Sequence, residues 1–261
     1  PLPPGVVPYA LAVAPDGGWL VADHPGRRVL HRPPAGDWSI LPWVVDHPRV
    51  LATGVDGVVH VLGRKGPGLD VLQRFRWLPP FLPAESTGET VATGDIDAMT
   101  IHPVSGVLWS ESGRVRDQTG RLWLELPPGS RVESMASGRG GLAVAGAGQI
   151  WIMKPDETVW KVVNRSVERL PSTALRALAW DATQLLLAEH ARGRVWSWTE
   201  EASFRLLAGA LDVQVKDPLP VQGEIPALSA DIGAPTALLP LGGGRILLAD
   251  ALSASLLEWQ P

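Results

Sequence analysis

The chain has 261 residues, 45% of them hydrophobic, and its 28 glycines and 25 prolines are spread along its whole length. Its formal net charge of −4 argues against a nucleic-acid-binding protein, whose affinity depends on cationic contacts to phosphate. No apolar run reaches the ~18 residues needed to cross a membrane, so we expect no membrane span. The absence of cysteine excludes disulfides and thiolate metal sites.

One short phrase recurs six times along the chain. It places small residues beside Leu or Met, as in PYALA, LRALA and PTALL, and in chain order it occupies residues 8–12, 48–52, 96–100, 132–136, 175–179 and 235–239. An almost continuously apolar run follows each phrase, at residues 19–23, 57–63, 106–111, 141–146, 184–189 and 245–250. Intervals of about 35 to about 60 residues are typical of four-stranded propeller blades with insertions.

The composition of each repeat assigns its strands. Small side chains indicate an innermost strand, and the apolar run indicates a second strand that is buried on both faces. Third strands are predicted at residues 27–32, 70–75, 120–125, 149–153, 193–198 and 254–259, and fourth strands at 38–43, 157–163 and 203–208. Four of the 12 tryptophans fall at or near one position of the third strands, which favours packing between blades over a ligand cage: Trp123, Trp151, Trp196 and Trp259.

We therefore predict an all-β fold, a closed six-bladed β-propeller that forms a single domain over residues 1–261. The predicted blades cover residues 8–47, 48–95, 96–130, 131–173, 174–234 and 235–261. The last copy ends after three strands, so residues 1–7 are predicted to supply the outer strand of that blade and to close the ring. Residues 78–95 and 211–233 interrupt the period and are predicted to be surface loops.

The segments GWLVADHPGRRVL, QLLLAEHARGRVW and RILLADALSASLLEW resemble the repeat of NHL propellers, which reads L-Y-V-A-D and then x-x-N-x-R-V. The resemblance is strong in copies one, five and six and weak in the others. It implies a six-bladed propeller but little about activity, since this fold class hosts sensors, scaffolds, RNA binders, lactonases and lyases. It also implies that Asp23, Glu189 and Asp250 are structural acids that cap a turn or pair with an arginine, Arg28 or Arg194.

Two sets of polar residues are expected at one mouth of the propeller channel. The variable residue at the start of each inner strand gives Tyr9, Arg49, Asp97, Glu133, Arg176 and Thr236. The ends of the second strands add His24, Arg64, Glu111 and His190. Because all ten can form hydrogen bonds on one face, this mouth is the predicted ligand site. The alternative is that the alternating charges only neutralise one another and order channel water.

The histidines divide by position. His24 and His190 occupy equivalent positions in blades one and five, where they either converge on a ligand or are ordinary surface residues. His60, within a second strand, and His102, in a turn on the opposite face, are expected to be structural. The remaining two, His31 and His47, are expected to be exposed.

A metal-dependent hydrolase or lyase fits these residues poorly. A hard divalent cation needs several oxygen ligands, and the acids of the first set, Asp97 and Glu133, are flanked by arginines. A zinc lyase needs about three converging histidines, and only two are predicted on this face. A quinone-cofactor dehydrogenase would suit a cationic mouth with histidines. We expect no metal and no cofactor, and a binding, sensory or scaffolding role, with the metal-dependent hydrolase or lyase as the alternative.

The expected partner is a protein, a peptide or a small-molecule ligand, and the chain is expected to be a monomer. The loop at 78–95 begins with apolar residues, including Phe81 and Leu82, and offers a second anchor for a partner. The sequence opens with PLPPGVV and no initiator Met, which is consistent with a removed secretory signal or an expression tag. The compartment stays open, with an extracytoplasmic location slightly favoured.

Overall fold

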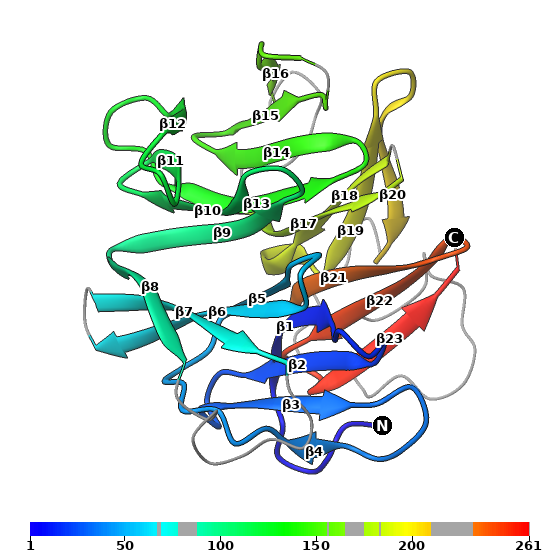
Figure 1. Cartoon of the computed structure of the whole chain (residues 1–261). Helices are drawn as coiled ribbons and strands as arrows, with labels where there is room; N and C mark the ends of the chain where they lie inside the picture. The colour runs from blue at the N-terminus through cyan, green and yellow to red at the C-terminus, as the bar shows by residue number, and fades with distance from the viewer. Residues whose placement is uncertain are drawn as a thin grey trace. The chain divides into compact units, whose positions relative to one another are not determined.

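The computed structural model describes residues 1–66, 69–77, 88–155, 157–164, 175–182, 184–209 and 232–260. These ranges form six antiparallel sheets, together with one short 3₁₀ helix, η2, at His190–Arg192. The predicted fold class, an all-β six-bladed propeller, is confirmed (Figure 1). The chain divides into two compact units, Pro1–Glu125 and Leu126–Pro261, with three sheets in each.

Unit 1 contains blades 1 to 3, coloured from blue to green in Figure 1. Blade 1 consists of β1 (Pro8–Val13), β2 (Trp19–Asp23), β3 (Arg28–Arg32) and β4 (Ser39–Ile40). Blade 2 consists of β5 (Val50–Thr53), β6 (Val58–Gly66), β7 (Leu69–Arg76) and β8 (Glu89–Gly94). Blade 3 consists of β9 (Ile96–His102), β10 (Gly106–Glu111), β11 (Arg114–Asp117) and β12 (Leu122–Glu125). In every blade, sequential strands are hydrogen-bonded neighbours.

Unit 2 contains blades 4 to 6. Blade 4 consists of β13 (Val132–Gly138), β14 (Gly141–Gly146), β15 (Gln149–Met153) and β16 (Lys161–Asn164). Blade 5 consists of β17 (Leu175–Asp181), β18 (Gln184–Glu189), β19 (Arg194–Thr199) and β20 (Ser203–Ala208). Blade 6 consists of β21 (Pro235–Gly242), β22 (Arg245–Asp250) and β23 (Ser255–Trp259).

Apolar side chains fill the spaces between neighbouring blades of each unit. In unit 1, Leu20 of blade 1 and Phe75 of blade 2 belong to one buried cluster, and Leu72 of blade 2 and Val107 of blade 3 belong to another. Unit 2 has equivalent clusters between blades 4 and 5 and between blades 5 and 6. Burial from both sides explains why the second strands are continuously apolar, and each fully buried Val or Leu contributes about 1.5–3 kcal/mol.

Two strand predictions are wrong. In blade 3 the third strand is β11, because Ser112 and Gly113, both with positive φ, form a tight turn directly after β10. Trp123 therefore lies in the fourth strand, β12, whereas the other three tryptophans of that set lie in third strands. In blade 2 the second half of the predicted loop at 78–95 is the fourth strand, β8, whose half-exposed, mostly polar sequence gave no apolar run.

The ends of the chain leave part of the prediction open. Residues 1–7 contain a turn and no strand, and Trp38 of blade 1 donates its indole N–H to the Pro1 carbonyl at 2.8 Å. Blade 6 has three strands among the described residues, as expected. Ring closure by residues 1–7 and the single-domain organisation stay predictions. The loop at 211–233 lies outside the described residues except for its last two, and Phe81 and Leu82 lie outside them entirely.

Candidate functional site

The predicted mouth residues share a backbone feature, a β-bulge at the start of the inner strand. The ladder between the first and second strands skips one residue in blades 1, 4, 5 and 6, and these are Tyr9, Glu133, Arg176 and Thr236. In blade 3 the shift falls where Asp97 and Ala98 both oppose Ser110. A bulge takes its extra residue out of the ladder and re-aims its side chain, which explains why this position varies between repeats.

Blade 2 shows the same arrangement in its hydrogen bonds. The Arg49 amide donates to the Leu62 carbonyl at 2.8 Å, although Leu62 is already the ladder partner of Val50. Arg49 and Val50 therefore both oppose Leu62. The first set of predicted site residues is thus one structural position, the bulge of each blade.

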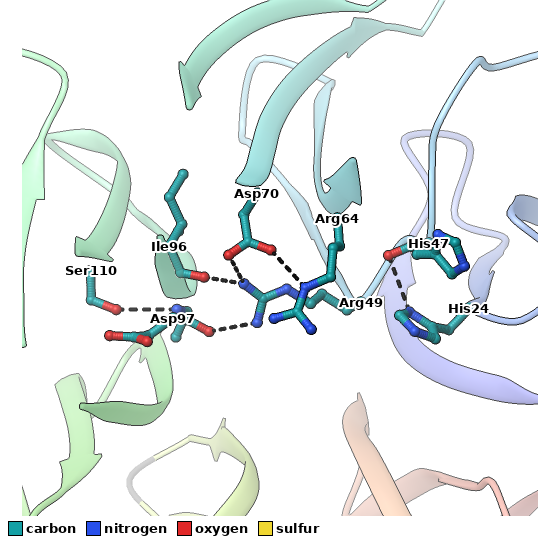
Figure 2. Close-up of polar contacts among 9 residues, drawn as sticks. His24, His47, Arg49, Arg64, Asp70, Ile96, Asp97 and Ser110 are labelled. Carbon is teal, nitrogen blue, oxygen red and sulfur yellow. Dashed lines mark hydrogen bonds and ion pairs between the residues drawn. The ribbon is translucent and has the colours of Figure 1, made fainter. Parts of the chain in front are cut away.

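Arg49 ties blade 2 to blade 3. Its guanidinium group donates to the backbone carbonyls of Ile96, through Nη2, and of Asp97, through Nη1 at 3.0 Å (Figure 2). Its Nη2 also lies 3.0 Å from the carboxylate of Asp70. The side chain is only 18% exposed, and this burial, together with the nearby charge of Arg64, lowers the pKa of Arg49. Arg49 therefore serves as a buried tie between inner strands.

Asp70 is shared by two arginines. It is 1% exposed, and its second oxygen lies 3.4 Å from Nε of Arg64, its cross-strand partner in the β6–β7 ladder. Arg64 is 52% exposed, so one guanidinium group of the pair is buried and the other reaches solvent. Figure 2 shows the two side chains next to each other below Asp70. One buried carboxylate therefore contacts two cations.

Tyr9, His24 and His47 form an aromatic group beside these charges. The rings of Tyr9 and His24 are stacked with centroids 4.8 Å apart, and the ring of His47 is tilted against His24 at 5.1 Å. Nδ1 of His24 lies 3.1 Å from the His47 carbonyl, which can only accept, so Nδ1 carries the proton. Burial, then the proximity of His47 and, to a smaller extent, of Arg49, lower the pKa of His24.

The remaining predicted residues of unit 1 contribute less. The carboxylate of Asp97 points away from the two guanidinium groups (Figure 2). Glu111 is exposed at the end of β10, where its carboxylate packs closely against Gly94 of β8. Unit 1 thus brings Tyr9, His24, Arg49 and Arg64 into one cluster.

In unit 2 the predicted residues mostly contact the backbone. Glu133 accepts a hydrogen bond from the Leu175 amide at 2.8 Å, across blades 4 and 5. His190 donates from Nδ1 to the Pro235 carbonyl at 3.3 Å, as His24 does in unit 1. Thr236 is 5% exposed, and its hydroxyl group contacts the Ala249 carbonyl at 3.4 Å. Arg176 is exposed on β17.

The acids at the ends of the second strands are structural, as the resemblance implies. Asp23 accepts from the amides of Val7 and Gly26 and from Nε of Arg28 at 2.8 Å. Glu189 accepts from the Trp196 indole at 3.1 Å. Asp250, which is 0% exposed, accepts from four backbone amides, including those of Gly233 and Ala234. These carboxylates therefore accept hydrogen bonds that stabilise the fold.

The other histidines include one correction. His31 was expected to be exposed but is buried, with Nε2 at 3.0 Å from Asp16 and its ring against Trp77. His47 is half-exposed and lies 2.9 Å from Asp46. His60 is buried in β6, as expected, and burial lowers its pKa to about 4. Within the described ranges, no three His, Asp or Glu side chains are grouped in a way that could hold a metal ion.

Sequence reasoning missed Asp70, the residue that organises the cluster. A signal was present. In blade 1 the acid ends the second strand and the arginine begins the third, Asp23 opposite Arg28. In blade 2 an arginine and an acid again face each other, but in the opposite order and one position beyond that of Asp23, with Arg64 on the second strand and Asp70 on the third. Comparing the third strands for charge would have placed Asp70 beside the predicted mouth arginines.

No protein-family model matches the chain, and no curated protein matches its sequence. Solved structures do match. Virginiamycin B lyase from Staphylococcus aureus is 12% identical, with 98% of this chain and 85% of that chain covered and a TM-score of 0.59. The PQQ-bound aldose sugar dehydrogenase from Streptomyces coelicolor is 12% identical, with 97% and 93% covered and a TM-score of 0.63.

A chain of the nidogen–laminin complex is also similar, at 12% identity, with 78% of this chain and 80% of that chain covered and a TM-score of 0.58. At these identities the likeness shows the fold alone. Propellers of this kind include a lyase, a dehydrogenase and a chain crystallised in a protein complex, so the fold does not select a function. Membership of the NHL family is not established by these comparisons. No helix in the described part of the chain is long and apolar enough to cross a membrane.

Proposed function

We propose that this propeller is a non-catalytic binding module that recognises a protein, peptide or small-molecule ligand. The ligand binds at the bulge ends of the blades, by which we mean the ends where each inner strand begins with its β-bulge and each second strand terminates. The observation that carries the proposal is that most polar side chains at these ends form hydrogen bonds to the protein backbone. Arg49, Glu133 and His190 each bond to the backbone of the following blade, and His24 bonds to the backbone of the segment that leads into it. Side chains that form such hydrogen bonds stabilise the arrangement of the strands, but they are poorly placed to transfer protons to or from a substrate.

The acids support the same conclusion. A general acid or base needs a carboxyl group that faces the substrate and can change its protonation state. Asp23, Glu189 and Asp250 are buried and accept hydrogen bonds from backbone amides, an indole or an arginine. Protonating any of them would break contacts that the fold requires, so they are weak candidates for catalysis.

The side chains that reach solvent at the bulge ends are cationic and aromatic. Arg64 and Arg176 are exposed at the bulge ends of blades 2 and 5, and Tyr9 and His24 form a stacked pair at blade 1. Side chains of these kinds are enriched where proteins bind partners, because they combine large contact area with directed hydrogen bonds.

A fragment screen by ligand-observed NMR tests this function. Anionic, cationic and neutral fragments would be screened against the wild-type protein and against an Arg64→Gln/Arg176→Gln variant, with Lys65→Gln as the control for loss of an exposed cation. We expect fragments whose signals reveal binding to the wild type and to the Lys65 variant but not to the double variant. Hits that bind all three proteins equally would contradict recognition at the bulge ends.

The alternative is a metal-dependent hydrolase or lyase. Calorimetry with Ca²⁺ and Zn²⁺ on the same protein distinguishes it from the binding module. The binding module predicts no stoichiometric uptake of either ion. Tight binding of one ion per chain, with turnover of a lactone panel that depends on it, would overturn the non-catalytic proposal.

A further inference from the structure

We propose that the bulge ends of blades 1 to 3 hold a site for a carboxylate group, with Arg64 as the residue that binds it and the Tyr9–His24 stack as its wall. This inference rests on the proposed function and deepens it by naming the chemical class of the ligand. It depends only on residues of unit 1.

The charges in this part of unit 1 favour an anionic ligand. Arg49 and Arg64 lie on either side of one carboxylate, that of Asp70, which is 1% exposed. Asp70 is the one carboxylate that contacts both guanidinium groups, and the nearby charge of Arg64 contributes to the lowered pKa of Arg49, which the charges of Asp70, Tyr9 and Asp97 offset only in part. An anion bound beside them relieves this repulsion.

The two arginines differ in how many of their nitrogen atoms are used by contacts within the protein. Both Nη atoms of Arg49 are used by the carbonyls of Ile96 and Asp97 and by Asp70. Arg64 contacts Asp70 only through Nε, and its side chain is 52% exposed. Its terminal nitrogens therefore face solvent while Asp70 fixes the position of the group. A guanidinium held in this way is preorganised for two parallel hydrogen bonds to a carboxylate.

The neighbouring acids of unit 1 are directed away from Arg64 or toward other partners. The carboxylate of Asp97 points away from the guanidinium pair (Figure 2). Asp46 lies 3.5 Å from Nε of Arg27 and 2.9 Å from Nδ1 of His47, so its own charge is partnered at the other side of the cluster. Glu111 lies against Gly94.

The aromatic wall indicates the shape of the ligand. Tyr9 and His24 are stacked within 25° of parallel and both half-buried, so each covers one face of the other, and the outer face of Tyr9 and the ring edges are left for a ligand. His24 is held by the His47 carbonyl, and His47 has a left-handed backbone with φ of 43°, a conformation that costs on the order of 1–3 kcal/mol for a residue other than glycine. Aromatic rings that lie near the charge of Arg49 favour a carboxylate carried on a planar or apolar body.

Such a carboxylate has two sources, a small aromatic acid or the C-terminus of a peptide. The experiment separates them with ¹⁹F NMR on the intact protein. The first arm titrates 4-fluorobenzoate, with 4-fluorobenzamide as the uncharged match. The second arm titrates an N-acetylated tetrapeptide that ends in 4-fluorophenylalanine, as the free acid and as the C-terminal amide.

We expect the acid of at least one pair to bind, and the matching amide to bind at least about tenfold more weakly, as the loss of a charge-assisted hydrogen bond predicts. Arg64→Gln should weaken the acid to the level of the amide. Lys65→Gln, which removes an exposed cation from the next position of β6, should leave the affinity within twofold of the wild type, because Arg64 is the one of these two cations that Asp70 holds in place.

The inference is overturned if acid and amide bind alike in both arms, if neither acid binds, or if the two variants weaken the acid equally. None of these results would contradict the binding module as such, since the fragment screen also contains cationic and neutral compounds. Conversely, loss of the wider proposal would require that no fragment depends on Arg64 and Arg176.

Discussion

The bulge ends of the two units share one backbone arrangement but use it for different contacts. In unit 1 the bulge residue Arg49 ties two inner strands together and leaves Arg64 exposed beside a shared carboxylate. In unit 2 the bulge residue Glu133 makes the equivalent tie through a single hydrogen bond to the Leu175 amide, and Thr236 is buried within its own blade.

The difference shows what a polar residue at a repeated position can do. A bulge removes the residue from the ladder, so the sequence there is not constrained by strand pairing. The side chain is then free to stabilise the next blade, to recognise a ligand, or to do both. We propose that unit 1 combines the two tasks by using a second arginine, whereas the contacts of unit 2 serve mainly the first.

The largest expected effect is the loss of the buried tie in unit 1. Arg49→Met should lower the free energy of unfolding by about 3–5 kcal/mol, because it leaves Asp70 buried without its closer partner and removes hydrogen bonds to two carbonyls. Urea unfolding measures this loss. Adding Asp70→Leu should restore most of it, and failure of the double variant to recover would contradict the buried ion pair.

The matched change in unit 2 sharpens the comparison. Glu133→Gln keeps an oxygen that can accept from the Leu175 amide, so the expected loss is about 1 kcal/mol or less. The same urea titration checks it. A loss as large as that of the Arg49 variant would mean that the two units use their bulge residues in the same way.

The second largest effect is the response of unit 1 to acid. His60 is buried and its pKa is lowered to about 4, so the unfolded chain takes up a proton near pH 6.5 before the folded chain does. Stability should fall as the pH drops from about 6.5 to about 4, by at most on the order of 3 kcal/mol.

The equivalent second-strand positions in unit 2 are apolar, Ala143, Leu186 and Leu247, so this contribution belongs to unit 1. A His60→Leu variant should lose the corresponding part of the acid sensitivity between pH 6.5 and pH 4. The check is a series of urea titrations across that range. An unchanged slope of stability against pH in the variant would contradict a neutral, buried His60.

A smaller loss of stability, equal in the two units, is expected when the structural acid at the end of a second strand is replaced. Asp23→Asn in unit 1 turns an amide nitrogen toward Nε of Arg28, Asp250→Asn in unit 2 turns one toward a backbone N–H donor, and each should cost about 2 kcal/mol. Thermal unfolding at neutral pH measures both. If only one variant loses stability, the shared structural role of these acids is wrong.

The smallest effect is expected for an exposed pair. Arg74 and Glu89 approach to 2.7 Å on the outer strands of blade 2, yet both are well exposed. Glu89→Gln should change the free energy of unfolding by no more than about 0.5 kcal/mol. A loss above 1 kcal/mol would show that the outer strand β8 contributes more to unit 1 than its burial indicates.

The repeated phrases were enough to predict the blades because each strand type has its own burial. The apolar runs such as LLLA at 185–188 are buried from both sides, and the small residues of the inner strands follow from crowding. The wrong strand predictions occurred where a strand is too short or too exposed to show an apolar pattern in the sequence. The short strand β11 and the polar edge strand β8 are set by a tight turn and by ladder pairing rather than by hydrophobicity.

For the site, the sequence predicted which positions carry polar side chains but not what those side chains contact. The alignment of repeats identified Arg49 and Arg64 as residues of one face. It could not show that Arg49 reaches the carbonyls of Ile96 and Asp97, because these lie 47 and 48 residues away along the chain. Nor does a repeat pattern reveal that Asp70 is shared, since this depends on the packing of neighbouring strands.

The most direct measurement follows the Nε–H signal of Arg64 in ¹⁵N–¹H spectra during titration with benzoate, with the signal assigned by its absence in Arg64→Gln. We predict a saturable shift of this signal with benzoate and no comparable shift with benzamide. An Arg64 signal that stays in place while benzoate shifts signals elsewhere would contradict the carboxylate site in unit 1.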